Sequence, residues 1–226
     1  MCPLDHSDLG SNQHALDPNA ATISRGTALE PAIGEARDET AIQLPIVIEP
    51  DFVVDILRPY KCNARYLKAA TITQIHAKAS ENARALALVT ASGQFAIPES
   101  CYIDDTGHFN AVEFNICFNQ LAYVMFGKCV EAGIFHKLRC ERLKVPSLAE
   151  YKRDQLPAMV IVSIESRYYK QLNSREFTAT LSLDKIASVG VAWFFSCSVS
   201  FADADGVKAK GAVLLAYNPD FAPVRH

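Results

Sequence analysis

The sequence lacks a strong excess of charge of either sign. Its 226 residues carry 22 Lys and Arg against 25 Asp and Glu, for a formal net charge of −3. A near-neutral chain offers no general electrostatic attraction to nucleic acid or to an anionic membrane, so we expect neither as a partner. The densest basic stretch is either a solvated surface or a docking patch for a carrier protein; it comprises Lys137, Arg139, Arg142 and Lys144.

Long apolar runs and paired cysteines are also missing. No stretch approaches the roughly 20 apolar residues that span a bilayer, and no basic segment followed by an apolar one begins the sequence. The seven cysteines form no CxxC pair and mostly lie in apolar runs, where Cys behaves as a small buried hydrophobe. These features predict a cytoplasmic protein without a disulfide framework, a metal site or another cofactor.

Several motifs of catalysis and nucleotide binding are absent, namely GxGxxG, GxxxxGK[ST] and GxSxG. The first two absences disfavour nucleotide-binding α/β folds, and the third removes the serine nucleophile of α/β hydrolases. Neither Cys101 nor Cys117 has a histidine at a spacing that identifies a catalytic partner. If the chain is an enzyme, we expect it to activate a small nucleophile by general base catalysis, without a covalent intermediate.

What the sequence does contain is a polar stretch followed by regular apolar patterns. Residues 1–45 are rich in Ala, Asp, Asn, Ser and Pro and are expected to form a flexible extension before one domain at 46–226. The predicted elements of that domain are a short helix at 51–57, strands at 70–77, 84–90 and 94–97 with a turn at 91–93, a long helix at 110–132, a mostly irregular stretch at 134–156 with a helical turn near 148–153, and strands at 158–168, 176–183, 189–202 and 208–217.

The order of these elements indicates the fold class. The last four strands are separated by short polar turns, one of them expected at 184–188, which is typical of an antiparallel meander. A single long helix precedes them, and βα units do not alternate. The sequence therefore predicts an α+β fold in which a long central helix is wrapped by an antiparallel β-sheet.

The long helix is apolar around most of its circumference, as helices of a protein core are. Asn110 and Glu113 form a capping-box pattern at its start. One narrow polar stripe runs along it and comprises Asn110, Glu113, Gln120, Lys128 and Glu131. Asn115 and Asn119 lie four residues apart and interrupt the apolar surface on one face. Because a buried amide without hydrogen bonds costs about 1–3 kcal/mol, these two side chains need partners, either within the protein or in a ligand.

The segment before this helix, YIDDTGHF at 102–109, combines a glycine with a histidine. A loop containing Gly107 that enters a helix N-terminus places free backbone N–H groups where they can stabilise a carbonyl oxygen or an anion. His108 is either a general base near neutral pH or a structural histidine, and Glu113 is either a base or only a cap. Asp104 and Asp105 most simply form the turn.

At these residues the sequence resembles a known family. The strings TGHFNAVEFNICFNQLAY and RPYKCNARYL are similar to the FcoT-like thioesterases, and the resemblance spans roughly 51–217. It implies a hotdog fold that assembles as a homodimer, and often as a trimer of dimers, with an acyl pocket at the dimer interface. It also implies a polar site that falls on Tyr66, Tyr102, Asn110 and Asn119.

The resemblance implies one of two activities. Members of the family are long-chain acyl-CoA thioesterases, or they add glycine to C3 of a (2E)-enoyl thioester on an acyl carrier protein (ACP) and release a 3-[(carboxymethyl)amino] fatty acid in isonitrile lipopeptide biosynthesis. Both activities fit a site with an acyl-ACP or acyl-CoA substrate and no nucleophilic side chain. A non-catalytic acyl-binding hotdog module remains the third hypothesis.

The candidate residues take the following roles. We assign catalysis to Tyr102, His108, Glu113 and Asn119, and substrate binding to Tyr66, Gly107, Asn110 and Asn115. His108, as the base, and Glu113, as its orienting partner, are assigned in addition to the positions that the family resemblance implies. The carboxylate of glycine would need a donor, for which Arg65, Tyr66 and Lys68 are the candidates.

Overall fold

The computed structural model describes residues 42–76, 87–104, 108–138 and 144–218, which belong to one compact unit beginning at Ile42. Its helices are α1 (Pro50–Ile56), the 3₁₀ helix η1 (Cys62–Ala64), α2 (Ala111–Glu131), α3 (Ile134–Lys137) and α4 (Leu148–Ala158). Its strands are β1 (Ile46–Ile48), β2 (Leu67–Ile75), β3 (Val89–Phe95), β4 (Met159–Tyr168), β5 (Phe177–Val189), β6 (Ala192–Asp203) and β7 (Gly206–Tyr217). Most of the predicted extension at 1–45 lies outside the described residues.

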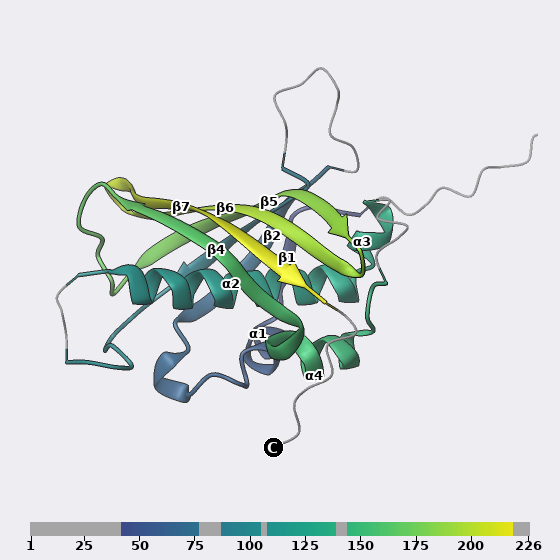
Figure 1. The fold of residues 1–226 in the computed structure, drawn as a ribbon. Coiled ribbons are helices and arrows are strands. Elements are labelled where there is room, and N and C mark those ends of the chain that lie inside the picture. Colours follow the sequence, from purple (N-terminus) through teal and green to yellow (C-terminus); the bar gives the residue numbers. More distant parts are fainter. Residues whose placement is uncertain (1–41, 77–86, 105–107, 139–143, 219–226) are drawn as a thin grey trace, which may run out of the picture. The chain divides into compact units, whose positions relative to one another are not determined.

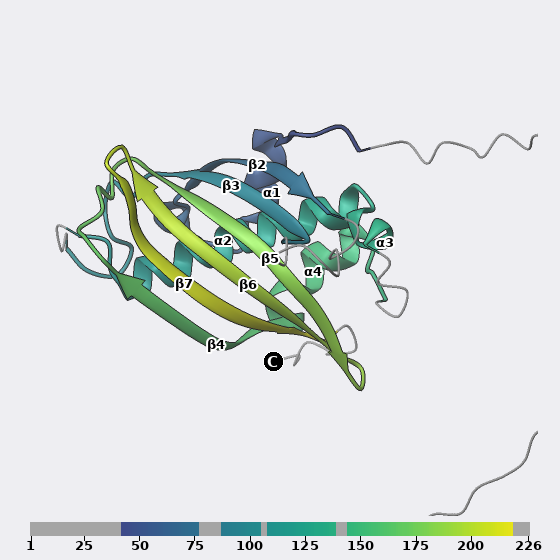
Figure 2. The same ribbon diagram turned by 90° about the horizontal axis from the view of Figure 1, so that it is seen from above.

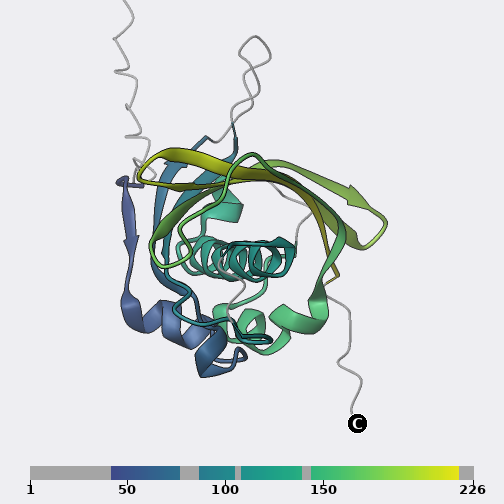
Figure 3. The ribbon, with the colours of Figure 1, turned by 90° about the vertical axis from the view of Figure 1, so that its left-hand side faces the viewer.

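The strands form a single seven-stranded sheet in the order β1-β2-β3-β5-β6-β7-β4, and every pairing is antiparallel. The sheet curls around α2, which lies along its concave side (Figure 1 and Figure 3). Seen from above, the long strands cross α2 obliquely, with β4 at one outer edge (Figure 2). A long helix enclosed by an antiparallel sheet is the hotdog fold, so the predicted α+β architecture is confirmed.

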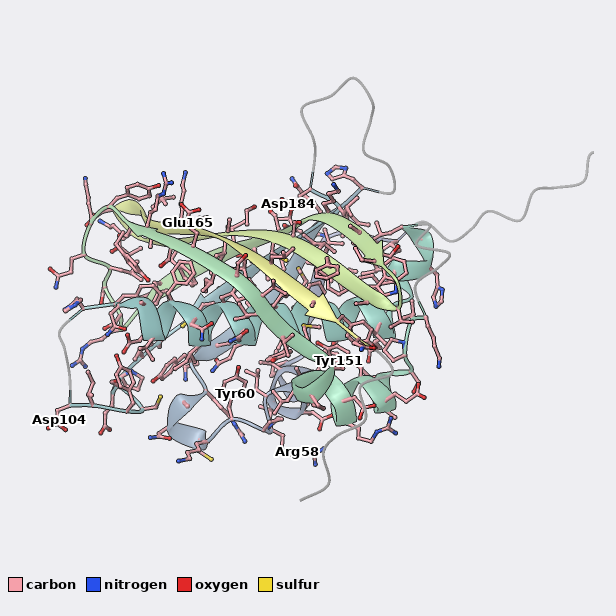
Figure 4. The ribbon with its side chains drawn as sticks, in the orientation of Figure 1. Arg58, Tyr60, Asp104, Tyr151, Glu165 and Asp184 are labelled. Carbon is pink, nitrogen blue, oxygen red and sulfur yellow. The ribbon has the colours of Figure 1, made fainter. Side chains whose placement is uncertain are left out.

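A second layer covers the side of α2 that faces away from the sheet. It consists of α1 and α4, as the end view shows (Figure 3). Tyr151 of α4 is buried beneath α2 (Figure 4), and its hydroxyl donates a hydrogen bond to the carbonyl of Tyr123 at 2.8 Å. The core of the unit therefore lies on both sides of α2. Within the described ranges, no helix combines the length and the apolar character needed to cross a membrane.

Two glycines set how closely the layers approach α2. A Cβ atom at Gly211 of β7 would lie 2.5 Å from the ring of Phe114 and would also clash with the carbonyl oxygen of Glu165. A Cβ atom at Gly127 of α2 would lie 2.9 Å from Ile56 of α1. Since carbon atoms do not approach so closely, the missing side chains allow α2 to pack tightly against both layers.

The start and end of α2 follow from local sequence, as predicted. The Asn110 side chain accepts a hydrogen bond from the Val112 N–H at 2.8 Å, and the Glu113 carboxylate accepts one from the Asn110 N–H at 3.3 Å. Together they form the expected capping box. Gly133 follows the helix with φ of 64°, a left-handed conformation that favours glycine.

Three residues of the polar stripe of α2, Glu113, Gln120 and Lys128, are buried, and two of them hold the helix to the N-terminal part of the domain. The Gln120 side chain is fully buried, and its Oε1 accepts hydrogen bonds from the backbone N–H groups of Tyr66 and Leu67, both at 2.9 Å. Its Nε2 donates to the carbonyl of Ala64 at 2.5 Å. One amide therefore satisfies three backbone groups where η1 leads into β2, which fixes the entry of the chain into the sheet.

Lys128 makes the second such connection near the other end of the helix. Its ammonium lies 3.0 Å from Glu49, just before α1, and 2.7 Å from Glu131. Burial works against the charged form, but the hydrogen bonds to Glu131 and Glu49 raise the pKa of Lys128 overall. Two members of the predicted stripe, Gln120 and Lys128, thus connect α2 to residues 49–67.

The predicted turn at 91–93 is wrong. Ala91, Ser92 and Gly93 lie inside β3 and pair with β2 on one side and with β5 on the other. A Cβ atom at Gly93 would lie 2.9 Å from both Leu67 and Phe95, so glycine is needed here for packing rather than for a turn. The strands predicted at 84–90 and 94–97 are therefore one strand, and residues 84–86 lie outside the described part.

The predicted turn at 184–188 is also wrong, and the predicted irregular stretch contains more helix than expected. β5 continues to Val189 through an irregularity between Leu183 and Lys185, with Asp184 on the outer face of the sheet (Figure 4). The chain turns instead at Gly190, whose φ is 61°. Within 134–156, helix α4 begins at a capping box formed by Ser147 and Glu150, a local signal that is present in the sequence.

Replacing Gln120 tests how much the buried amide contributes to stability. Gln120→Met keeps the volume but leaves two N–H groups and one carbonyl without their partner. At about 1–3 kcal/mol for each unsatisfied group, we expect the free energy of unfolding in urea to fall by about 3 kcal/mol or more. Gln74→Met on the exposed face of β2 is the control and should change it by less than about 0.5 kcal/mol. Equal effects of the two substitutions would contradict this role.

Candidate active site

Three hydrogen bonds hold the segment 100–102, two of them to the beginning of α2 and one to Tyr66, which precedes β2. The Ser100 hydroxyl donates to Glu113 at 3.2 Å, and the Cys101 N–H donates to the Tyr66 hydroxyl at 2.9 Å. The Asn110 side-chain amide donates to the Tyr102 hydroxyl at 2.7 Å. The structure therefore brings together Tyr66, Tyr102 and Asn110, three of the four positions that the resemblance implies, whereas Asn119 is not part of this group.

Tyr66 and Tyr102 differ in their surroundings. The Tyr66 side chain is fully buried, and burial raises the pKa of its hydroxyl above the usual range, although the hydrogen bond from the Cys101 backbone N–H acts in the opposite direction. It therefore stays protonated and serves as an anchor for the loop. Tyr102 is 43% exposed and accepts a hydrogen bond from Asn110, which leaves its own O–H to donate to a ligand.

A cleft of about 590 Å³ opens beside the N-terminus of α2. One wall comes from the residues that lead into the helix, and the other comes from the end of β4 and the loop after it. The lining residues are His108, Phe109, Asn110, Ala111, Tyr168, Tyr169, Lys170 and Gln171. His108 and Asn110 thus share one cleft, on the side of α2 where a helix carries its partial positive charge.

An aromatic cluster supports the floor of this cleft. Phe109 is buried, and its ring centroid lies 5.0 Å from that of Phe201 and 5.3 Å from that of Phe177. It also lies 6.3 Å from Phe114, which is the residue four positions into the helix. This pairing is the hydrophobic staple that often accompanies a capping box. It holds His108 and Asn110 in place on either side of Phe109.

Asn115 and Asn119 lie apart from this cleft, further along α2. The Asn119 amide donates to the Asn115 side-chain oxygen at 3.3 Å, so the two residues predicted to need partners pair with each other. Both are half-buried rather than enclosed, as is Ile116 beside them. Their remaining hydrogen-bonding groups face an open strip of the helix surface.

Glu113 does not share that strip with Asn115. Residues two apart lie on opposite sides of a helix, and the Glu113 side chain is buried among Ser100, Asn110 and Tyr66. Each of its carboxylate oxygens accepts a hydrogen bond, which accounts for its burial without a ligand. Its role as a base stays a prediction. Gly107 lies outside the described residues.

The three buried cysteines among the described residues provide no activated thiol. Cys117 is fully buried, and desolvation with the nearby Glu113 carboxylate raises the pKa of its thiol well above the usual value. Burial likewise raises the pKa of Cys129 and of Cys197. A thiol with a raised pKa is a weak nucleophile at neutral pH. Among the residues with described positions, no three His, Cys, Asp or Glu side chains are grouped to hold a metal ion.

Sequence reasoning missed two parts of the site. The staple residue Phe109 has a local signal, because an apolar residue before the cap and another four residues into the helix form the staple pattern. The second cleft wall, which includes Tyr168, Lys170 and Gln171, has none, since about 60 residues separate it from His108 and only the folded sheet brings them together.

Comparison with known proteins gives consistent matches across this region. A family model described as FcoT-like thioesterase domain matches residues 55–217. A protein named (2E)-enoyl-[ACP] glycyltransferase from Streptomyces coeruleorubidus is 33% identical over 170 residues, which cover 73% of this chain and 94% of that protein. One with the same name from Mycobacterium marinum is 37% identical over 173 residues, which cover 75% and 86%.

Solved structures match with less similarity. A putative thioesterase from Shewanella oneidensis aligns with a TM-score of 0.40 and 6% identity, over 75% of this chain and 97% of that chain. The fold assignment accordingly rests on the strand order and the position of α2 described above.

Substitutions of Asn110 separate its capping role from its contact with Tyr102. Asn110→Asp retains an N-cap oxygen but loses the amide that donates to Tyr102, so we expect the free energy of unfolding to stay within about 0.5 kcal/mol of the parent protein. Asn110→Ala loses the cap as well and should cost about 1 kcal/mol. Urea denaturation measures both. If Asp were as destabilising as Ala, the contact with Tyr102 rather than the cap would hold this end of the helix.

Proposed function

The chain belongs to the FcoT-like thioesterase family, and we propose that it adds glycine to C3 of a (2E)-enoyl-ACP and then hydrolyses the thioester. The product is a 3-[(carboxymethyl)amino] fatty acid, the type of intermediate used in isonitrile lipopeptide biosynthesis. The names of relatives at 33% and 37% identity support glycine addition as the reaction.

The observation that carries this proposal is the Asn110–Tyr102 pair beside a cleft that also contains His108. Tyr102 keeps an O–H to donate to the thioester oxygen, and His108 lines the cleft as the candidate general base. The described residues that line the cleft include no cysteine or serine that would form an acyl-enzyme. Such a site suits a reaction in which a bound amine, and then water, is the nucleophile.

The chemistry balances without an oxidant or a reductant. The glycine amine gives up a proton to His108 and attacks C3; the C–N bond forms, and the π electrons of the C2–C3 bond move toward the thioester oxygen. A proton returned to C2 restores the carbonyl. Water then attacks this carbonyl, the C–S bond breaks, and the carrier thiol leaves with a proton.

Asn115 and Asn119 fit the proposal as contacts for the acyl portion. They lie on the half-buried strip of α2, beside Val112 and Ile116. Amides among apolar side chains suit an acyl substrate that is polar at its thioester and apolar along the rest of its acyl group. In this proposal Asn119 donates to the substrate and Asn115 orients the Asn119 amide through their hydrogen bond.

We further propose that the protein works as a homodimer, with β4 at the interface. β4 pairs with β7 alone among the described strands, so its outer edge is open along ten residues. The exposed apolar side chains along it are Val160, Val162, Ile164 and Tyr168. A long apolar edge is normally covered by a partner, and a second copy here would enclose the open strip of α2.

Product analysis tests the proposed reaction. Purified protein incubated with glycine and crotonyl- or decenoyl-ACP should release an acid heavier than the enoyl acid by one glycine, detected by mass spectrometry. Free thiol release from saturated acyl-CoA at a comparable rate, with no glycine adduct at any chain length, would favour the plain thioesterase instead. Absence of both reactions would favour an acyl-binding module.

The Asn110→Asp variant links the site to this activity. Because it keeps the helix cap, its loss of the donor to Tyr102 should lower the rate of adduct formation by about 10-fold or more without unfolding the protein. Asn119→Ala should do the same through loss of a substrate contact. If both folded variants turned over at the parent rate, the site would have to lie elsewhere.

Charged substitutions in β4 test the interface. Val162→Asp combined with Ile164→Asp should convert the dimer to a monomer in light scattering, because the charges would be desolvated against the partner strand. Val189→Asp combined with Val191→Asp is the matched control at the β5–β6 hairpin, where both side chains are also exposed, and should leave the dimer intact. Dissociation by the control pair alone would place the interface at the hairpin.

A further inference from the structure

The loop between β4 and β5 is fixed firmly enough to act as a binding wall. The N–H of Tyr169 donates to the carbonyl of Lys208 at 2.8 Å, and the N–H of Asn173 donates to the Asp203 carboxylate at 3.1 Å. Leu172 is buried in the core with an exposed fraction of 3%. With contacts at three separate positions, the backbone at Lys170 has a defined place beside the cleft.

The buried ammonium of Lys208 beneath this loop is neutralised by neighbouring aspartates. The Lys208 ammonium lies 3.3 Å from Asp203 and 3.6 Å from Asp205. Although burial works in the opposite direction, N–H donors from Asn173 and Asp205, together with Lys208, lower the pKa of Asp203. Asp203 therefore stays ionised opposite Lys208, and this pair adds little net charge to the cleft.

Lys170 differs from Lys208 in this respect. Its side chain is exposed and lines the cleft together with His108 and Asn110. Over the part of the chain that the structure describes, no carboxylate lies within ion-pair distance of its ammonium, and none of the residues lining the cleft is acidic. Among the described residues, the cleft thus carries a positive charge without a counterion, which favours an anionic ligand.

The residues first expected to bind the glycine carboxylate are committed elsewhere. Arg65 donates to the backbone carbonyls of Tyr60 and Arg58, and Lys68 donates to the carbonyl of Arg65. Lys68 also borders a different cleft, together with Arg175. The Tyr66 hydroxyl is buried and bonded to Cys101. Within the described residues, the cleft that holds His108 and Asn110 has one lysine and no arginine.

We propose that Lys170 binds the carboxylate of the incoming amino acid and so makes the site select glycine over simple amines. This assignment rests on the proposed function, since it names how the second substrate is held. Lys170 forms no covalent bond. Its ammonium holds the carboxylate while the amine, one carbon away, is presented to His108 and to C3 of the enoyl group.

Steady-state kinetics of Lys170→Met test the assignment. A charge-assisted contact of this kind is worth about 10- to 100-fold in affinity, so KM for glycine should rise by about that factor at saturating enoyl-ACP. We expect kcat to change by less than about threefold, and KM for enoyl-ACP to stay constant. Lys170→Arg should restore most of the glycine affinity. Lys210→Met, which removes an exposed lysine of β7 outside the cleft, is the control and should leave both KM values unchanged.

The preference for glycine over glycinamide, an amine without a carboxylate, provides a second measurement that a general structural defect would not alter. The parent protein should prefer glycine over glycinamide, and Lys170→Met should lose this preference because the carboxylate no longer has a partner. An unchanged KM for glycine, or a rise in KM for enoyl-ACP alone, would overturn the assignment; the latter would mean that Lys170 binds the phosphate of the carrier arm. If the parent protein formed no glycine adduct at all, the proposed function would fail and this assignment with it.

Discussion

The buried amide of Gln120 is the contact on which the rest of the site depends. It binds three backbone groups at the start of β2 and thereby fixes Tyr66. The Tyr66 hydroxyl in turn holds Cys101, the neighbouring Tyr102 meets Asn110, and the Asn110 side chain caps α2. The hydrogen bonds form a closed path from the middle of the helix, through the sheet and loop, back to its first turn. A shift at any step would move Tyr102 relative to the cleft.

This rigidity suits a site that has few reactive groups of its own. The two cysteines of α2 are buried, and burial raises the pKa of Cys117, so we expect rate enhancement to come from positioning and from hydrogen bonds to developing charge. Lys170 lines the cleft and is able to bind an anion, and Tyr102, bonded to the lining residue Asn110, is able to donate to a thioester oxygen. An amine nucleophile that carries a carboxylate matches both.

The features that the sequence predicted well are local ones. The capping box of Asn110 and Glu113 and the stop at Gly133 depend on residues a few positions apart, and the structure has them as expected. The errors at 91–93 and 184–188 arose where strand pairing and packing override residues that favour turns, as at Gly93 beside Leu67. The partner of Asn119 proved to be Asn115, and Lys170 joined the site only through the sheet order.

A crystal structure with a stable product analogue would test the account most directly. The probe is a 3-[(carboxymethyl)amino]acyl group joined to the pantetheine arm by an amide, which the enzyme cannot hydrolyse. We predict that its carboxylate lies about 3 Å from the Lys170 ammonium, with its secondary amine facing His108. A carboxylate bound instead in the cleft lined by Lys68 and Arg175, with the cleft beside α2 left without the probe, would contradict the account.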